Sequence, residues 1–141
     1  MNPTTLMSAG IALTSGAALA LSLLFSRVFS VTMYYHFAFF IVSLALLGIA
    51  VGGVAVYVMP RVFRDERKLL LAGFAAALVA PLTLLAVHVA VDNPLSVKLE
   101  GDSVGRLLEI YAATAAPFFA SGLAVTLVMS AAKDAIGRVY G

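Results

Sequence analysis

The chain has 141 residues, of which 62% are hydrophobic and 11% are charged. Soluble domains carry about 45–50% apolar and about 25% charged residues, so this composition excludes an ordinary soluble domain and also an intrinsically disordered chain. The absence of cysteine excludes disulfides, thiolate metal sites and a cysteine nucleophile. The net charge of +2 is small and is divided between separate segments, which argues against nucleic acid as a partner.

Four uncharged runs are each long enough to cross the hydrocarbon core of a bilayer as a helix, which takes about 18–20 residues. The runs cover residues 5–26, 37–59, 69–91 and 110–132, and all 16 charged side chains lie outside them. Because backbone polar groups inside a bilayer must pair within their own segment, each run predicts a helix. The predicted fold is an all-α bundle of four transmembrane helices that forms one domain over residues 1–141.

The segments between the runs set the expected boundaries and orientation. Pro60 is expected to end the second helix, Asp65 to cap the third, and Ser103 to cap a fourth helix that enters the membrane near Ile110. The loop 60–68 and the tail 133–141 carry six Lys or Arg residues, whereas the segments 27–36 and 92–109 carry three. The positive-inside rule therefore places both termini in the cytoplasm. None of these segments is long enough to hold a catalytic domain, so we expect no enzyme activity.

Small residues recur four positions apart in three of the spans. This spacing lets helix backbones approach closely, and we expect it to serve packing within the chain, with a homodimer interface as the alternative. The predicted packing positions are Ala12, Gly16, Gly48, Gly52, Pro117 and Ser121.

Two prolines and two histidines lie in or next to the spans. Pro81 and Pro117 each remove one backbone donor, which predicts a kink. His36 and His88 are both expected near the outer interface, where a pair could ligate a haem or a metal. The alternative assigns His36 to an interfacial aromatic belt and His88 to a polar contact within the bundle. With no third ligand in the pattern, we predict neither a metal nor a cofactor.

Several short runs resemble the N-terminal membrane part of bacterial polytopic spermidine synthase-like proteins. The most specific is Tyr-Tyr-His-Phe-Ala-Phe at residues 34–39, and the others are residues 43–53, 117–124 and 136–141. In that family similar segments precede further membrane helices, with a helix arrangement like the first part of a major-facilitator half, and many members then carry a cytoplasmic aminopropyltransferase domain. The resemblance implies a multi-pass protein of the bacterial inner membrane. It also implies that the chain is a fragment, a split-gene subunit or a complete short relative.

The sequence shows no strand followed by a Gly-rich turn, so the family's catalytic residues have no counterpart here. We therefore expect a non-enzymatic membrane module that packs against lipid and against another membrane polypeptide or a second copy. Small residues Gly122, Ala124 and Ala131 suggest the fourth span as that interface. One alternative is a transporter or channel component of major-facilitator-like type, although no Asp, Glu, Lys or Arg lies within a span to carry a coupled charge. The other is a haem- or pigment-binding subunit that uses His36 and His88.

The orientation generates a first prediction. Because the chain has no native cysteine, single cysteines at positions 64 and 96 report on opposite faces of the membrane. An impermeant thiol reagent applied to intact cells should label the Ser96→Cys variant and leave Arg64→Cys unlabelled, since the basic loop is retained in the cytoplasm. Labelling of Arg64→Cys alone would reverse the orientation.

Overall fold

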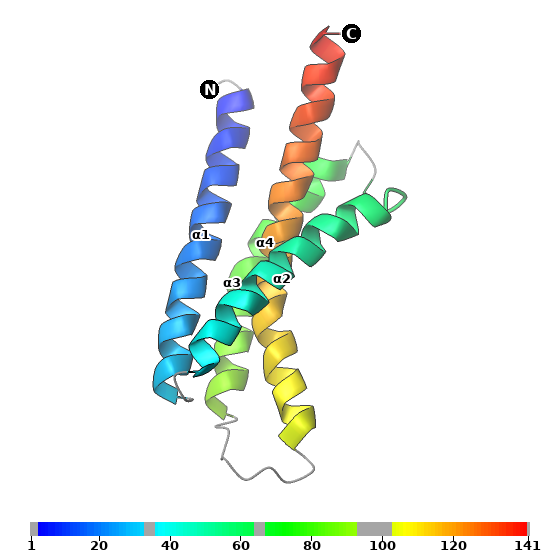
Figure 1. Cartoon of the computed structure of the whole chain (residues 1–141). Coiled ribbons are helices and arrows are strands. Elements are labelled where there is room, and N and C mark those ends of the chain that lie inside the picture. Colours follow the sequence, from blue (N-terminus) through cyan, green and yellow to red (C-terminus); the bar gives the residue numbers. More distant parts are fainter. Residues whose placement is uncertain (1–2, 33–35, 64–66, 93–102, 141) are drawn as a thin grey trace.

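A computed structural model describes residues 3–32, 36–63, 67–92 and 103–140. The four helices are α1 (Pro3–Thr32), α2 (His36–Val58), α3 (Lys68–Asp92) and α4 (Ser103–Tyr140), and the described residues include no strand. All four helices are long and apolar enough to cross a membrane. Figure 1 shows the N- and C-termini at the same end of the bundle, as four spans require. The chain is therefore an all-α, multi-pass membrane protein.

Most helix boundaries agree with the sequence. Helix α2 ends two residues before Pro60, and α4 begins at Ser103. Helix α1 is longer than predicted because it continues past Arg27 to Thr32. The reason is Phe29, which is buried in the core one turn after the buried Phe25, so the helix gains packing by continuing beyond the charged residue. The proposed cap Asp65 lies outside the described residues.

Helix α4 is the central helix of the bundle. It contacts each of the other three helices, and α1 and α2 also contact each other. In the apolar stretch of each helix, 44% of the residues are buried in α4, compared with 28% in α2, 17% in α3 and 11% in α1. In Figure 1, α2 runs diagonally across α4. The fold is thus built around α4, and α1 is the helix least covered by the rest of the chain.

The apolar core lies toward one end of the bundle, where α1 and α3 end and where α2 and α4 begin. Phe25 packs edge-to-face against Phe29 and Phe118, with ring centroids 6.1 and 6.0 Å apart. Such aromatic pairs add a preferred geometry to the area that they bury. The buried members of this core are Phe25, Phe29, Ile41, Ala45, Ala86, Ala90, Ile110 and Phe118.

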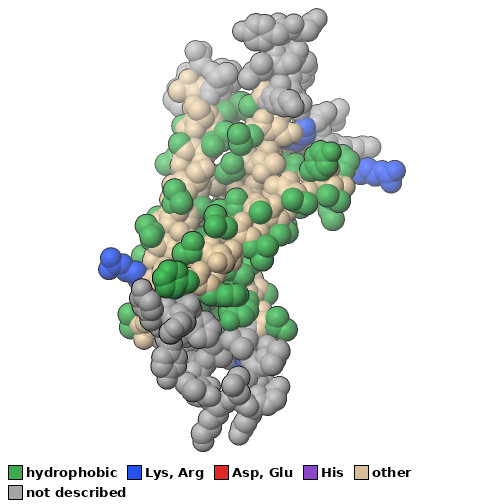
Figure 2. All heavy atoms as spheres, viewed as in Figure 1, with side chains coloured by type: hydrophobic (Ala, Val, Ile, Leu, Met, Phe, Trp, Pro, Cys, Tyr) green, Lys and Arg blue, Asp and Glu red, His purple; other side chains and the backbone are tan. Residues whose placement is uncertain are grey.

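The outer surface of the helices is apolar. Figure 2 shows hydrophobic side chains over most of the visible helical surface, with Lys and Arg only near its ends. Many exposed side chains are large, among them Leu13, Leu23, Leu46 and Phe74. In water such a surface would drive aggregation, but it matches the hydrocarbon core of a bilayer.

Candidate functional site

Helices α2 and α4 cross with their backbones in close contact. A Cβ atom added to Gly52 would lie 2.6 Å from the Phe119 carbonyl oxygen and 2.8 Å from the Leu123 nitrogen. One added to Gly48 would lie 2.8 Å from the Phe118 Cβ atom. These separations are shorter than any side chain tolerates without a shift of the α4 backbone. The structure therefore places the predicted small-residue pair of the second span directly against another helix of the same chain.

The crossing is glycine-lined from both sides. Gly122 of α4 faces the backbone of Ile49, and a Cβ atom there would clash with the Ile49 carbonyl oxygen and Cα atom. Close backbone approach without Cβ atoms maximises van der Waals contact, which is the main attraction between helices in lipid. Toward the N-terminal ends of the same two helices, the rings of Phe40 and Tyr111 lie against each other at a tilt of 34°, with centroids 4.4 Å apart.

Pro117 and Ser121 are both buried in the middle of α4. The helix continues through Pro117, and α3 likewise continues through Pro81. The Ser121 hydroxyl donates to the Pro117 carbonyl at 2.9 Å, and two turns earlier the Thr114 hydroxyl donates to the Ile110 carbonyl at 2.7 Å. Each hydroxyl donates its hydrogen bond within its own helix, so neither residue needs a polar partner on another helix.

Two cavities flank Ser121. One of about 330 Å³ lies between α1, α2 and α4, and one of about 190 Å³ lies between α1, α3 and α4. The larger is lined mainly by apolar side chains, together with Ser15, Ser22 and Ser121. The Ser22 hydroxyl donates to the Leu19 carbonyl at 2.8 Å, so its donor also stays within its helix. These spaces suit apolar groups, such as acyl chains or side chains of another helix.

The predicted packing pair on the first span lies on an exposed part of α1. Ala12 and Gly16 are exposed, and a Cβ atom added to Gly16 would meet no heavy atom of the described structure within 4 Å. The physical reason is that α1 is held through Phe25 and Phe29 near its C-terminal end. Of the small residues expected at an interface on the fourth span, Gly122 and Ala124 are buried inside the bundle and Ala131 is half-buried.

Of the two histidines of the predicted pair, the structure describes the side chain of His88. The His88 side chain is 74% exposed, and its Nε2 atom lies 3.1 Å from a carboxylate oxygen of Asp92, one turn further along α3. The exposed position of His88 differs from the expectation that it makes a polar contact inside the bundle. The side chain of His36 lies outside the described residues. Within the described ranges, no group of three or more His, Asp or Glu side chains is arranged to hold a metal.

The sequence analysis missed one buried polar contact. Lys68 is the first residue of α3 and only 8% exposed, and its Nζ atom donates to the Ser130 hydroxyl of α4 at 2.9 Å. By sequence, Lys68 is simply the last charge of a basic loop. No local pattern indicates that Ser130, which is 62 positions away, lies beside it.

The crossing, the apolar cavities and the apolar exterior together define a polytopic helical membrane protein. No family model, no curated protein and no solved structure matches the chain.

The glycine crossing generates a second prediction. Gly52→Leu should lower the free energy of unfolding in mixed micelles by about 1–3 kcal/mol, because the side chain must push the α4 backbone away. The matched control is Gly73→Leu on α3, where the added side chain meets open space and the change should stay within about 0.5 kcal/mol. Equal losses in both variants would show that α2 and α4 do not cross at Gly52.

Proposed function

We propose that the chain is a non-enzymatic integral membrane module that packs against another membrane polypeptide or a second copy, in the bacterial inner membrane. The proposal takes up the resemblance to the membrane part of spermidine synthase-like proteins. It is supported by an interior in which hydroxyl groups bond to their own helices and by a surface that is largely apolar. These features suit packing and give little support to bond-breaking chemistry.

The single observation that carries the proposal is the exposed N-terminal half of α1. Its C-terminal end packs through Phe25 and Phe29, whereas Ala12 and Gly16 are exposed and a Cβ atom added to Gly16 would meet no described atom within 4 Å. Small residues gain little from contact with lipid but let a second helix approach closely. The two cavities lie beside the middle of α1, at residues 13–22, and leave further space next to α4. We therefore assign the intermolecular interface to α1, in place of the fourth span.

A transporter or channel component is the second candidate. The observation that favours it is the position of the cavities on both sides of Ser121, one turn after Pro117 in a helix that lacks one backbone donor. An apolar lining fits an apolar solute better than an ion. Liposomes that contain the purified chain would test this candidate, since uptake of an apolar fluorescent solute above that of protein-free liposomes would favour it.

The interface on α1 generates a third prediction. A photo-crosslinking residue at Ala12 or Gly16 should give products with a second polypeptide in native membranes, because both positions are exposed on α1. The control is Ala18, which is buried in the bundle and should give products within the chain. Mass spectrometry of the products identifies the partner. Exclusively intramolecular products from all three positions, with a monomer in mild detergent, would contradict the proposal.

A further inference from the structure

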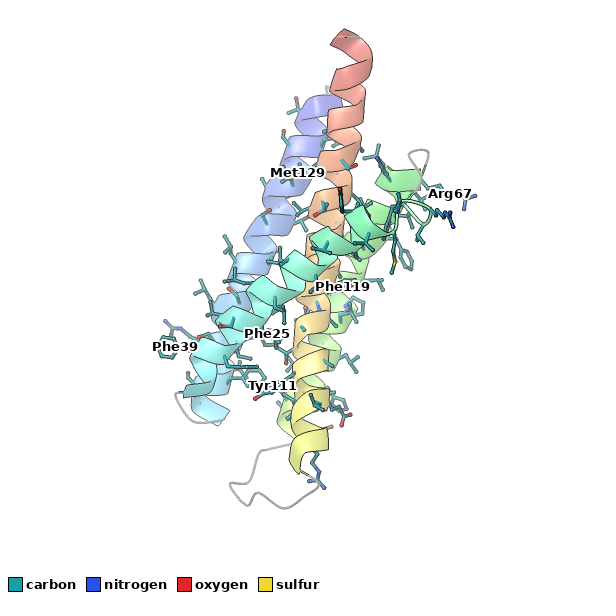
Figure 3. All side chains as sticks on the ribbon, turned by 45° about the vertical axis from the view of Figure 1, so that its right-hand side comes forward. Phe25, Phe39, Arg67, Tyr111, Phe119 and Met129 are labelled. Atoms are coloured by element: carbon teal, nitrogen blue, oxygen red, sulfur yellow. The ribbon has the colours of Figure 1, made fainter. Side chains whose placement is uncertain are left out.

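The turn between α2 and α3 combines exposed basic and exposed apolar side chains. Arg61 and Arg67 are exposed, and Tyr57, Met59 and Val62 beside them are 88%, 53% and 60% exposed. Figure 3 shows Arg67 at the outer edge of the bundle, near the C-terminal end of α2. A membrane interface favours this combination, because apolar side chains can contact the acyl chains while guanidinium groups lie at the level of the headgroups.

The backbone holds both arginines in defined positions. The amide of Val62 donates to the Met59 carbonyl at 3.1 Å, which folds the residues around Arg61 into a turn at the end of α2. On the other side, the Lys68–Ser130 hydrogen bond ties the first residue of α3 to α4. Arg67 is the residue immediately before Lys68. The two guanidinium groups are therefore presented at one end of the bundle by segments that are each anchored.

The charge distribution points to an anionic ligand at this end. The loop 60–68 and the tail 133–141 hold six basic and three acidic residues, whereas the segments at the opposite end, 27–36 and 92–109, hold three basic and four acidic residues. Arginine presents a planar fork of donors that matches the oxygens of a phosphate. The expected cytoplasmic location places the arginines at the leaflet that carries the anionic lipids.

We propose that Arg61 and Arg67, the exposed arginines between the end of α2 and the start of α3, bind the phosphate of an anionic phospholipid headgroup. The neighbouring Met59 and Val62 favour a lipid over a soluble phosphate, because exposed apolar side chains contribute to binding only when the ligand brings acyl chains with it. The inference concerns lipid and does not depend on whether α1 binds a partner.

The experiment uses the purified full chain in mild detergent. Native mass spectrometry counts bound lipids, and thermal unfolding is followed as phosphatidylglycerol, phosphatidylcholine or inorganic phosphate is added. We expect phosphatidylglycerol to bind more tightly than phosphatidylcholine. The double variant R61Q/R67Q should weaken this preference by about fivefold per arginine removed. R61K/R67K should retain part of the preference, since it keeps the charge but loses the fork.

The matched control is R27Q/R106Q, which removes two exposed arginines from the opposite end of the bundle. This control should retain the preference for phosphatidylglycerol. The proposal is overturned if R61Q/R67Q binds both lipids as the parent chain does, or if R27Q/R106Q loses the preference equally. Equal stabilisation by inorganic phosphate would also overturn it, because a soluble anion would then account for the site.

Discussion

The fold depends on the close crossing of α2 and α4. Gly48 and Gly52 on one helix and Gly122 on the other remove the Cβ atoms that would hold the two backbones apart. Lipid tails are as apolar as the helices, so burial of apolar surface gives no net drive to associate, and attraction depends on close contact. This crossing brings α2 onto α4, and the aromatic contacts of Phe118 then attach α1 to the same helix.

The interior stays apolar although it contains hydroxyl groups and a proline. Thr83, Thr114 and Ser121 each donate to a carbonyl one turn earlier in their own helix. Among the described residues, no buried side-chain nitrogen or oxygen lacks a hydrogen-bond partner. Local satisfaction lets these residues lie in a bilayer without partners on other helices. These hydroxyl groups thus leave the apolar character of the helices intact, which suits contact of their outer surface with lipid.

The bundle has a compact end and an open end. The core around Phe25, Phe29 and Ile110 fills the compact end. Beyond this core, two cavities lie between the middle of α1 and α4, and the N-terminal half of α1 is largely exposed. Arg67 lies at the open end, near the C-terminal end of α2. The proposed partner and the proposed lipid therefore bind different elements: the N-terminal half of α1 and the α2–α3 turn.

The number of spans, the end of α2 before Pro60 and the start of α4 at Ser103 were all predictable from sequence, because hydropathy and backbone chemistry act locally. The sequence did not predict which residues the small residues contact. Gly16 and Gly52 sit in similar local patterns, yet one faces open space and the other faces a backbone. In lipid every helix face is apolar, so no pattern of polar and apolar residues marks the inward side. Only the tertiary structure decided that α4 is central and that Lys68 lies beside Ser130.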